Sequence, residues 1–175
     1  MLTFLQKIFC TIALSLNLNA PCGVHVDRVN TPLTQIQLFE ALSESHRAVF
    51  GVTPTATRLS MAWAQVSFEN GRGALVFNNN LGNIGTNNRP RRPFYKLAGS
   101  KFRSFQNPIM GGKAYWITLR NRCSSALSHF DSGDTSSVAI YLDKCGYYRT
   151  DVEIYRKNIA SLFNEAQTMS SWRKW

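Results

Sequence analysis

The apolar residues of the chain recur with a helical period on both sides of one irregular central region. Residues 31–51 open with Thr31 as a candidate cap and Pro32 in the first turn, and they end at Gly51. The apolar positions between these signals recur near helical spacing, at steps of three or seven residues, namely Leu33, Ile36, Phe39, Leu42 and Val49. This spacing predicts an amphipathic helix.

A second helix is predicted after Thr53 and Pro54, which again combine a cap with a first-turn proline. The helix stops at Asn70 and Gly71, so Glu69 falls in its last turn. Its apolar residues are too numerous for one face, which predicts a largely buried helix: Leu59, Ala62, Trp63, Ala64 and Val66.

Residues 71–106 are rich in glycine, asparagine and proline, with short apolar pieces such as "ALVF" and "KFRSF". We expect loops with a small hairpin there. After Pro108 the helical pattern returns in "PIMGGKAYWITLRNR", "CSSALSHF", "TSSVAIYLDKCG" and "DVEIYRKNIASLFNEA". The fold class is therefore mainly α, in the α+β sense of helices with one small β element.

The length of 175 residues suits one domain, expected over 23–168 with a basic, aromatic tail at 169–175. Residues 1–22 read either as a secretory signal or as an N-terminal helix that packs on the domain. The apolar run from Ile8 to Leu18 is too short to span a bilayer.

The net charge of +10 is concentrated in one stretch. No acidic residue lies between Glu69 and Asp131, where ten arginines and lysines occur, Arg89, Arg91 and Arg92 among them. A field of one sign attracts anions such as nucleic acid, anionic lipid or an acidic cell-wall polymer. Charge alone does not choose among these partners.

Cysteine and histidine spacing argues against a metal site, since the chain has no C-x-x-C motif and its three histidines are far apart in sequence. We expect no metal and no other cofactor. In an oxidising compartment Cys123 and Cys145 are a candidate disulfide pair.

Glu69 is the candidate for chemistry. A carboxylate at a helix C-terminus meets the negative end of the helix dipole, an effect of about 0.3–1 kcal/mol when exposed. Nearby Phe68, Trp63 and Phe77 would add desolvation, and both effects raise the pKa. A raised pKa suits a general acid that protonates a leaving oxygen, although a lone glutamate also serves to cap a turn or to pair with Arg72.

Four segments resemble, in order and approximate spacing over residues 53–165, the peptidoglycan-cleaving glucosaminidases, a lysozyme-like family of flagellar enzymes, autolysins and phage lysins. "AQVSFENGRG" is similar to their A-Q-x-x-x-E-S-G-x-G segment, and "NNNLGNI" to N-N-L-F-G-I. "KFRSF" is similar to F-R-x-Y-x-S, and "CGYYRTDVEIYRKNI" to G-Y-A-T-D-P-x-Y-x-x-K-I. The resemblance implies a lysozyme-like fold and cleavage of the glycan strand.

The resemblance makes Glu69 the general acid and places a tyrosine in the cleft. Tyr148 matches best because Tyr148, Thr150 and Asp151 reproduce the Y-x-T-D order, while an extra residue before Asp151 keeps Tyr147 open as an alternative. Val152 stands where the family has proline.

Further candidates for substrate binding are Asn79, Asn80, Asn83, Phe102, Tyr147 and Asp151. The asparagine amides suit sugar hydroxyls and N-acetyl groups, but asparagine is also a common turn former. Phe102, like Phe94 and Tyr95, would stack on a sugar face or belong to the core. Asp151 starts a helix, where capping is its ordinary role.

Most glycosidases use two carboxyl groups about 5–9.5 Å apart, yet the segment after Glu69 offers no second acid. Two mechanisms remain open. In one, Glu69 acts alone while the substrate's N-acetyl oxygen or 6-hydroxyl attacks the anomeric carbon. In the other, water attacks with help from a tyrosine or from an acid elsewhere in the chain.

The expected function is cleavage of peptidoglycan as an N-acetylglucosaminidase or a lytic transglycosylase, of phage or bacterial origin. The expected partners are glycan strands and an anionic envelope, not nucleic acid, for a monomer that acts in the periplasm, outside the cell or on a virion. The alternatives are a glycan-binding structural module and a nucleic-acid-binding protein, the latter lacking any recognition motif.

Overall fold

The structure is a computed structural model that describes residues 24–86 and 92–169. The expectations for residues 1–22, for Arg89 and Arg91 and for most of the tail lie outside these ranges. Within them, no helix is both long and apolar enough to cross a membrane.

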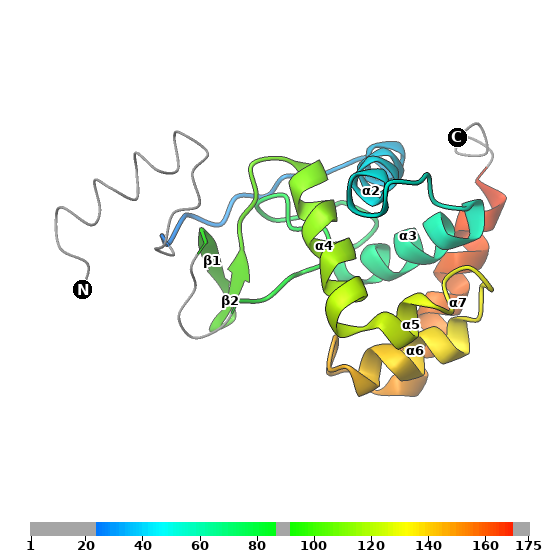
Figure 1. Cartoon of the computed structure of the whole chain (residues 1–175). Helices are drawn as coiled ribbons and strands as arrows, with labels where there is room; N and C mark the ends of the chain where they lie inside the picture. The colour runs from blue at the N-terminus through cyan, green and yellow to red at the C-terminus, as the bar shows by residue number, and fades with distance from the viewer. Residues whose placement is uncertain (1–23, 87–91, 170–175) are drawn as a thin grey trace, which may run out of the picture.

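The elements are mainly helical, as the sequence pattern predicts, and they form a helical body beside a small lobe (Figure 1). In chain order they are α2 (Gln35–Phe50), α3 (Ala56–Asn70), β1 (Phe94–Leu97), β2 (Ser100–Arg103), α4 (Pro108–Arg122), α5 (Ser124–Leu127), α6 (Thr135–Lys144) and α7 (Val152–Thr168). In the body, α3 packs on α7 and α2 packs on α4.

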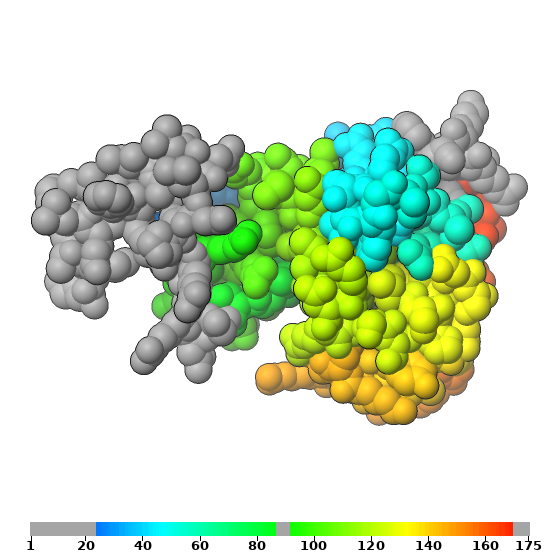
Figure 2. Space-filling view, in the orientation of Figure 1, coloured from blue at the N-terminus to red at the C-terminus, as the bar shows by residue number. Residues whose placement is uncertain are grey.

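The small lobe consists of residues 24–33, 71–86 and 92–106. Its hairpin pairs β1 with β2 in antiparallel register, with Phe94 opposite Arg103. The segment before α2 joins this lobe through bridges from His25 to Phe94 and from Asn30 to Phe77. Figure 2 shows an indentation in the surface between the small lobe and the turn 145–151 that joins α6 to α7.

Helix α2 begins three residues later than the sequence pattern predicts. Thr34, not Thr31, is its cap, and Thr34 and Gln37 form a reciprocal capping box. Thr31 is wrong as a cap because its hydroxyl is bonded to the small lobe, donating to the Val76 carbonyl and accepting from the Asn79 amide. Gly51 ends the helix in the left-handed conformation, as predicted.

The core lies between the helices and contains the predicted residues of α3, with Trp63 and Trp116 fully buried. Ile36 is an exception, since it is 53 % exposed while Leu38, Phe39 and Leu42 turn inward. The later start of α2 places Ile36 in its first turn, on the outer side.

Candidate active site

Glu69 lies in the last turn of α3, at the point where the chain leaves the helical body for the small lobe. Gly71 ends the helix with a φ of 61°, a conformation that costs glycine little. Asn70 fixes the reversal, because its Oδ1 accepts from the Gly73 amide at 2.8 Å and its Nδ2 donates to the Leu81 carbonyl at 3.2 Å. The sequence Asn-Gly after Glu69 therefore folds the following loop back beside the acid.

The Glu69 side chain is half-buried, and this burial raises the pKa of its carboxyl group. Hydrogen bonds from Asn83 and Tyr155 act in the opposite direction because they stabilise the carboxylate. The Tyr155 hydroxyl donates to Glu69 Oε1 at 3.3 Å, and the Tyr155 ring packs edge-on against Phe68. Phe68, one of the aromatic neighbours predicted from the sequence, thus packs on the tyrosine that binds the acid, and Tyr155 was not among those predicted.

Three tyrosines, Tyr115, Tyr147 and Tyr155, lie close enough to Glu69 for its charge to affect them. Burial raises the pKa of each phenol well above its usual value, and the neighbouring Glu69 carboxylate raises it further. All three phenols therefore stay protonated around the acid. Such neutral donors suit a site that binds uncharged sugar groups.

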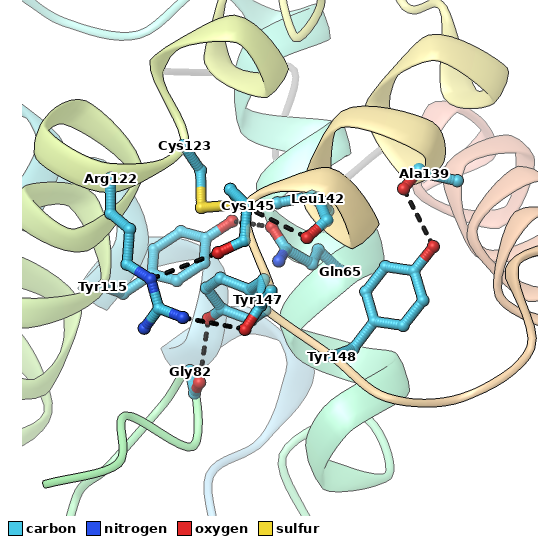
Figure 3. Close-up of a disulfide and its surroundings, with 11 residues drawn as sticks. Gln65, Gly82, Tyr115, Arg122, Cys123, Ala139, Leu142, Cys145, Tyr147 and Tyr148 are labelled. Atoms are coloured by element: carbon cyan, nitrogen blue, oxygen red, sulfur yellow. Dashed lines mark hydrogen bonds between the residues drawn. A yellow bond between two sulfur atoms is a disulfide. The ribbon is translucent and has the colours of Figure 1, made fainter. Parts of the chain in front are cut away.

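The hydroxyls of this cluster join α3, α4, the turn 145–151 and the loop after Glu69. Tyr115 donates to Gln65 Oε1 at 2.7 Å, and Tyr147 donates to the Gly82 carbonyl at 2.8 Å (Figure 3). A methyl group at Gly82 would meet Tyr115 and Tyr147 at 2.7 Å. Only glycine lets this loop approach both rings.

Tyr148, the tyrosine that the sequence favours, directs its hydroxyl to α6 and not to the acid. Its hydroxyl donates to the Ala139 carbonyl at 2.8 Å, and its ring is 8 % exposed and stacked on Tyr155. Figure 3 shows the Tyr147 and Tyr148 side chains pointing in different directions from the same turn. The geometry therefore favours Tyr147, the alternative left open by the motif.

The three candidate asparagines have different surroundings. Asn80 is fully buried, and its amide donates to the Ile84 and Arg103 carbonyls. Asn79 has a φ of 56° and donates to the Phe105 carbonyl. Both amides hold the loop in place, and substrate binding by Asn79 and Asn80 stays a prediction.

Asn83 is the asparagine that the loop brings to the acid. Its Nδ2 donates to the Glu69 backbone carbonyl at 2.9 Å, and it also interacts with the Glu69 carboxyl group. Asn83 is half-buried with a φ of 48°. It therefore keeps its place among the candidates for substrate contact.

The two remaining candidates occupy structural positions. Phe102 is half-buried on β2 and stacked on Tyr95, with ring centroids 5.7 Å apart. Asp151 caps α7, accepting from the amides of Glu153 and Ile154 at 2.9 and 3.1 Å. Its carboxylate serves the helix end, the ordinary role that the sequence also allowed, and substrate contact by Asp151 stays a prediction.

Sequence reasoning did not single out Gln65, Tyr115 or Tyr155 for the site. Both tyrosines are fully buried, yet their hydroxyls belong to the site. Gln65 precedes Glu69 by four residues and shares its helix face, a spacing that could have identified it. Tyr155 corresponds to the second tyrosine of the terminal motif segment, G-Y-A-T-D-P-x-Y-x-x-K-I.

A second carboxylate is not among the groups that bond to the Glu69 side chain or shift its pKa. All ten acidic residues lie in the described ranges, and no other one is among the groups that shift the pKa of Glu69. The part of the small lobe that follows Glu69 carries no acid, as the sequence shows, while the segment before α2 carries the exposed Asp27. Five others pair with arginines or cap helices: Asp131, Glu153, Glu165, Asp134 and Asp151.

Metal ligands do not gather in the part of the chain that the structure describes. No group of three His, Cys, Asp or Glu side chains there could hold an ion. The carboxyl groups are dispersed over the surface, and His46 is buried against Arg58.

Comparison with known proteins finds the same fold among solved structures. No family model matches the chain, and no curated protein does. A peptidoglycan hydrolase from Sphingomonas sp. A1 aligns with a TM-score of 0.55 at 17% identity, over 72% of this chain and 83% of that one. The glycoside hydrolase domain of FlgJ from Salmonella typhimurium aligns with a TM-score of 0.54 at 16% identity, over 81% and 94%.

A C-terminally truncated form of the FlgJ domain aligns with a TM-score of 0.55 over 99% of its length. These alignments span most of both chains, and the lysozyme-like architecture expected from the motifs is confirmed. The chain therefore has the fold of the peptidoglycan glucosaminidase-like domains that its sequence motifs resemble.

Proposed function

We propose that the protein cleaves the glycan strand of peptidoglycan, with Glu69 as the general acid. The observation that carries this proposal is a half-buried carboxyl group with a raised pKa, set among three neutral phenols. Support also comes from the fold, since solved proteins that share it are a peptidoglycan hydrolase and a glycoside hydrolase domain.

In the proposed reaction, protonated Glu69 gives its proton to the glycosidic oxygen as the bond to the anomeric carbon breaks. The leaving sugar departs as an alcohol, and positive charge develops on the ring. The substrate's own 6-hydroxyl or N-acetyl oxygen then attacks the anomeric carbon. When the 6-hydroxyl attacks, the Glu69 carboxylate takes its proton and the product carries a 1,6-anhydro end.

A substrate-supplied nucleophile fits the arrangement of acids. In most glycosidases a second carboxylate activates the water nucleophile, and none is among the groups that shift the pKa of Glu69. Tyr147, Tyr155 and Asn83 have neutral polar groups that would orient the sugar without competing for the proton. This favours a single acid that acts first as proton donor and then as base.

The basic residues of the small lobe support an anionic polymer as substrate. Arg28, Arg92, Lys96, Lys101 and Arg103 lie on this lobe, and partial burial with the neighbouring Arg92 lowers the pKa of Arg103. Peptidoglycan carries carboxylates that such a surface attracts. Binding to the polymer should therefore weaken as ionic strength rises.

The test compares wild type with Glu69→Gln, which keeps the shape of the side chain but has no proton to give. We expect release of soluble fragments from peptidoglycan to fall by about 10²–10⁴-fold, while cosedimentation with the polymer is retained. Glu44→Gln, the same change at an exposed position of α2, should leave turnover unchanged. Wild-type binding without cleavage would instead support a glycan-binding module.

A further inference from the structure

Two links join the end of α4 to the turn that carries Tyr147 (Figure 3). The Cys123–Cys145 disulfide is the first, with Cα atoms 5.5 Å apart, and confirms the candidate pair. The Arg122 guanidinium is the second, donating to the Cys145 carbonyl at 3.2 Å and to the Gly146 carbonyl at 2.9 Å. Arg122 and Cys123, at the C-terminal end of α4, thus hold Cys145 and Gly146 of the turn.

Tyr147 follows directly and connects this turn to the acid's loop. Its amide donates to the Leu142 carbonyl at 2.9 Å, and its hydroxyl reaches the Gly82 carbonyl. Asn83 follows Gly82 in that loop, and its side-chain amide donates to the backbone carbonyl of Glu69. The disulfide is therefore connected to the acid through a short series of contacts.

The same loop rests on the other end of α4. Gly111 lies against the Asn79 carbonyl so closely that a methyl group would overlap it. The loop 79–83 is thus supported by α4 at Gly111 and, through Tyr147, at Cys123. If the Cys123–Cys145 disulfide is opened, Tyr147 loses its fixed position, whereas the buried face of α6 still packs on α7.

We propose that Arg122 and the Cys123–Cys145 disulfide are positioning residues for Tyr147, and that full turnover requires the disulfide to be closed. This inference rests on the proposed function. Closure transfers two electrons and two protons from the thiols to a small-molecule disulfide such as oxidised glutathione, which leaves as two thiols. The enzyme is then weakly active in a reducing compartment and fully active where disulfides persist.

The first experiment uses the full chain with Cys10→Ser and Cys22→Ser, which leaves one pair of cysteines for a reductant to open. Below the melting temperature of the reduced form, we expect reduction to lower kcat at least about tenfold with KM changed less than about twofold. Hydrogen exchange should quicken at residues 143–151 and remain unchanged in α2 and α3. Unchanged kcat and exchange on reduction would overturn the proposal, as would faster exchange throughout the helices.

Arg122→Gln tests the second link. We expect a fall in kcat that Arg122→Lys does not restore, because lysine lacks the fork that reaches two carbonyls. Arg120→Gln is the matched control, since Arg120 lies in the same helix turn but donates to Val49. Equal losses in the two glutamine variants would contradict a specific role.

A double-mutant cycle shows whether the disulfide acts through Tyr147. In the Tyr147→Phe background, opening the disulfide should change kcat less than about twofold. Additive losses would contradict the proposed route. Should wild type show no cleavage at all, the proposed function fails, whereas the exchange measurement still decides whether the disulfide holds the turn.

Discussion

At Glu69, burial and hydrogen bonding act on the pKa in opposite directions. Burial disfavours the carboxylate, whereas Asn83 and Tyr155 stabilise it. The residual shift is upward, so the acid keeps its proton to a higher pH than an exposed glutamate. The folded-state pKa exceeds the unfolded one, and Glu69 thus contributes stability below the unfolded pKa that is lost as pH rises through the folded pKa.

Tyr155→Phe removes one of the groups that stabilise the carboxylate. The pKa of Glu69 should then rise, and the alkaline limb of the kcat/KM profile should move up by about 0.4–1 pH unit. Tyr148→Phe is the matched comparison, because the Tyr148 hydroxyl bonds to Ala139. A downward shift for Tyr155→Phe, or an equal shift in both variants, would contradict the assigned contact.

His46 gives a separate pH dependence to the fold. It is fully buried, with Nδ1 donating to the Val52 carbonyl and Nε2 accepting from Arg58. Desolvation, and then the Arg58 charge, lower the pKa of His46. Between the lowered pKa of the folded state and the unfolded pKa of about 6.5, His46 therefore binds more protons in the unfolded chain than in the folded one.

As pH drops from 7 towards 5, we expect the free energy of unfolding of wild type to fall relative to that of His46→Gln. Urea unfolding of both proteins across this range measures the difference. A difference that is constant with pH would show that His46 is not held neutral.

At the scale of elements, the helical pattern predicted the order of the described helices, the end of α3 and the small hairpin, but it placed the cap of α3 at Thr53 where the structure has Thr55. It misplaced the start of α2, because Thr31-Pro32 and Thr34 give similar local signals. Only the tertiary bonds of Thr31 to Val76 and Asn79 distinguish them. The loop asparagines were ambiguous for the same reason, since their partners lie on other segments.

Gly111 shows how α4 and the loop depend on each other. Gly111→Ala would push a methyl group into the Asn79 backbone, and we expect a loss of at least about 2 kcal/mol in stability with a fall in kcat. Gly85→Ala is the control, since its nearest contact would be 3.9 Å away. Thermal unfolding and turnover measured together would show whether loop and helix respond as one unit.

At the scale of the whole molecule, Glu69 joins a helical body to a basic small lobe. Its place in the last turn of α3 and the direction of its pKa shift could be predicted from the chain, because the helix end at Asn70-Gly71 and the neighbouring Phe68 are local in sequence. The tyrosine cluster could not, since Tyr115, Tyr147 and Tyr155 meet only when α4, α7 and the turn between α6 and α7 pack around α3. The choice between Tyr147 and Tyr148 likewise depended on this packing.

The central claim is that one acid cleaves the glycan. The most direct measurement is mass spectrometry of the soluble products from purified Gram-negative peptidoglycan digested in parallel with wild type and Glu69→Gln. Wild type should release muropeptides, with 1,6-anhydro ends when the 6-hydroxyl attacks, and the variant should release none. Release by Glu69→Gln at the wild-type rate would contradict the claim.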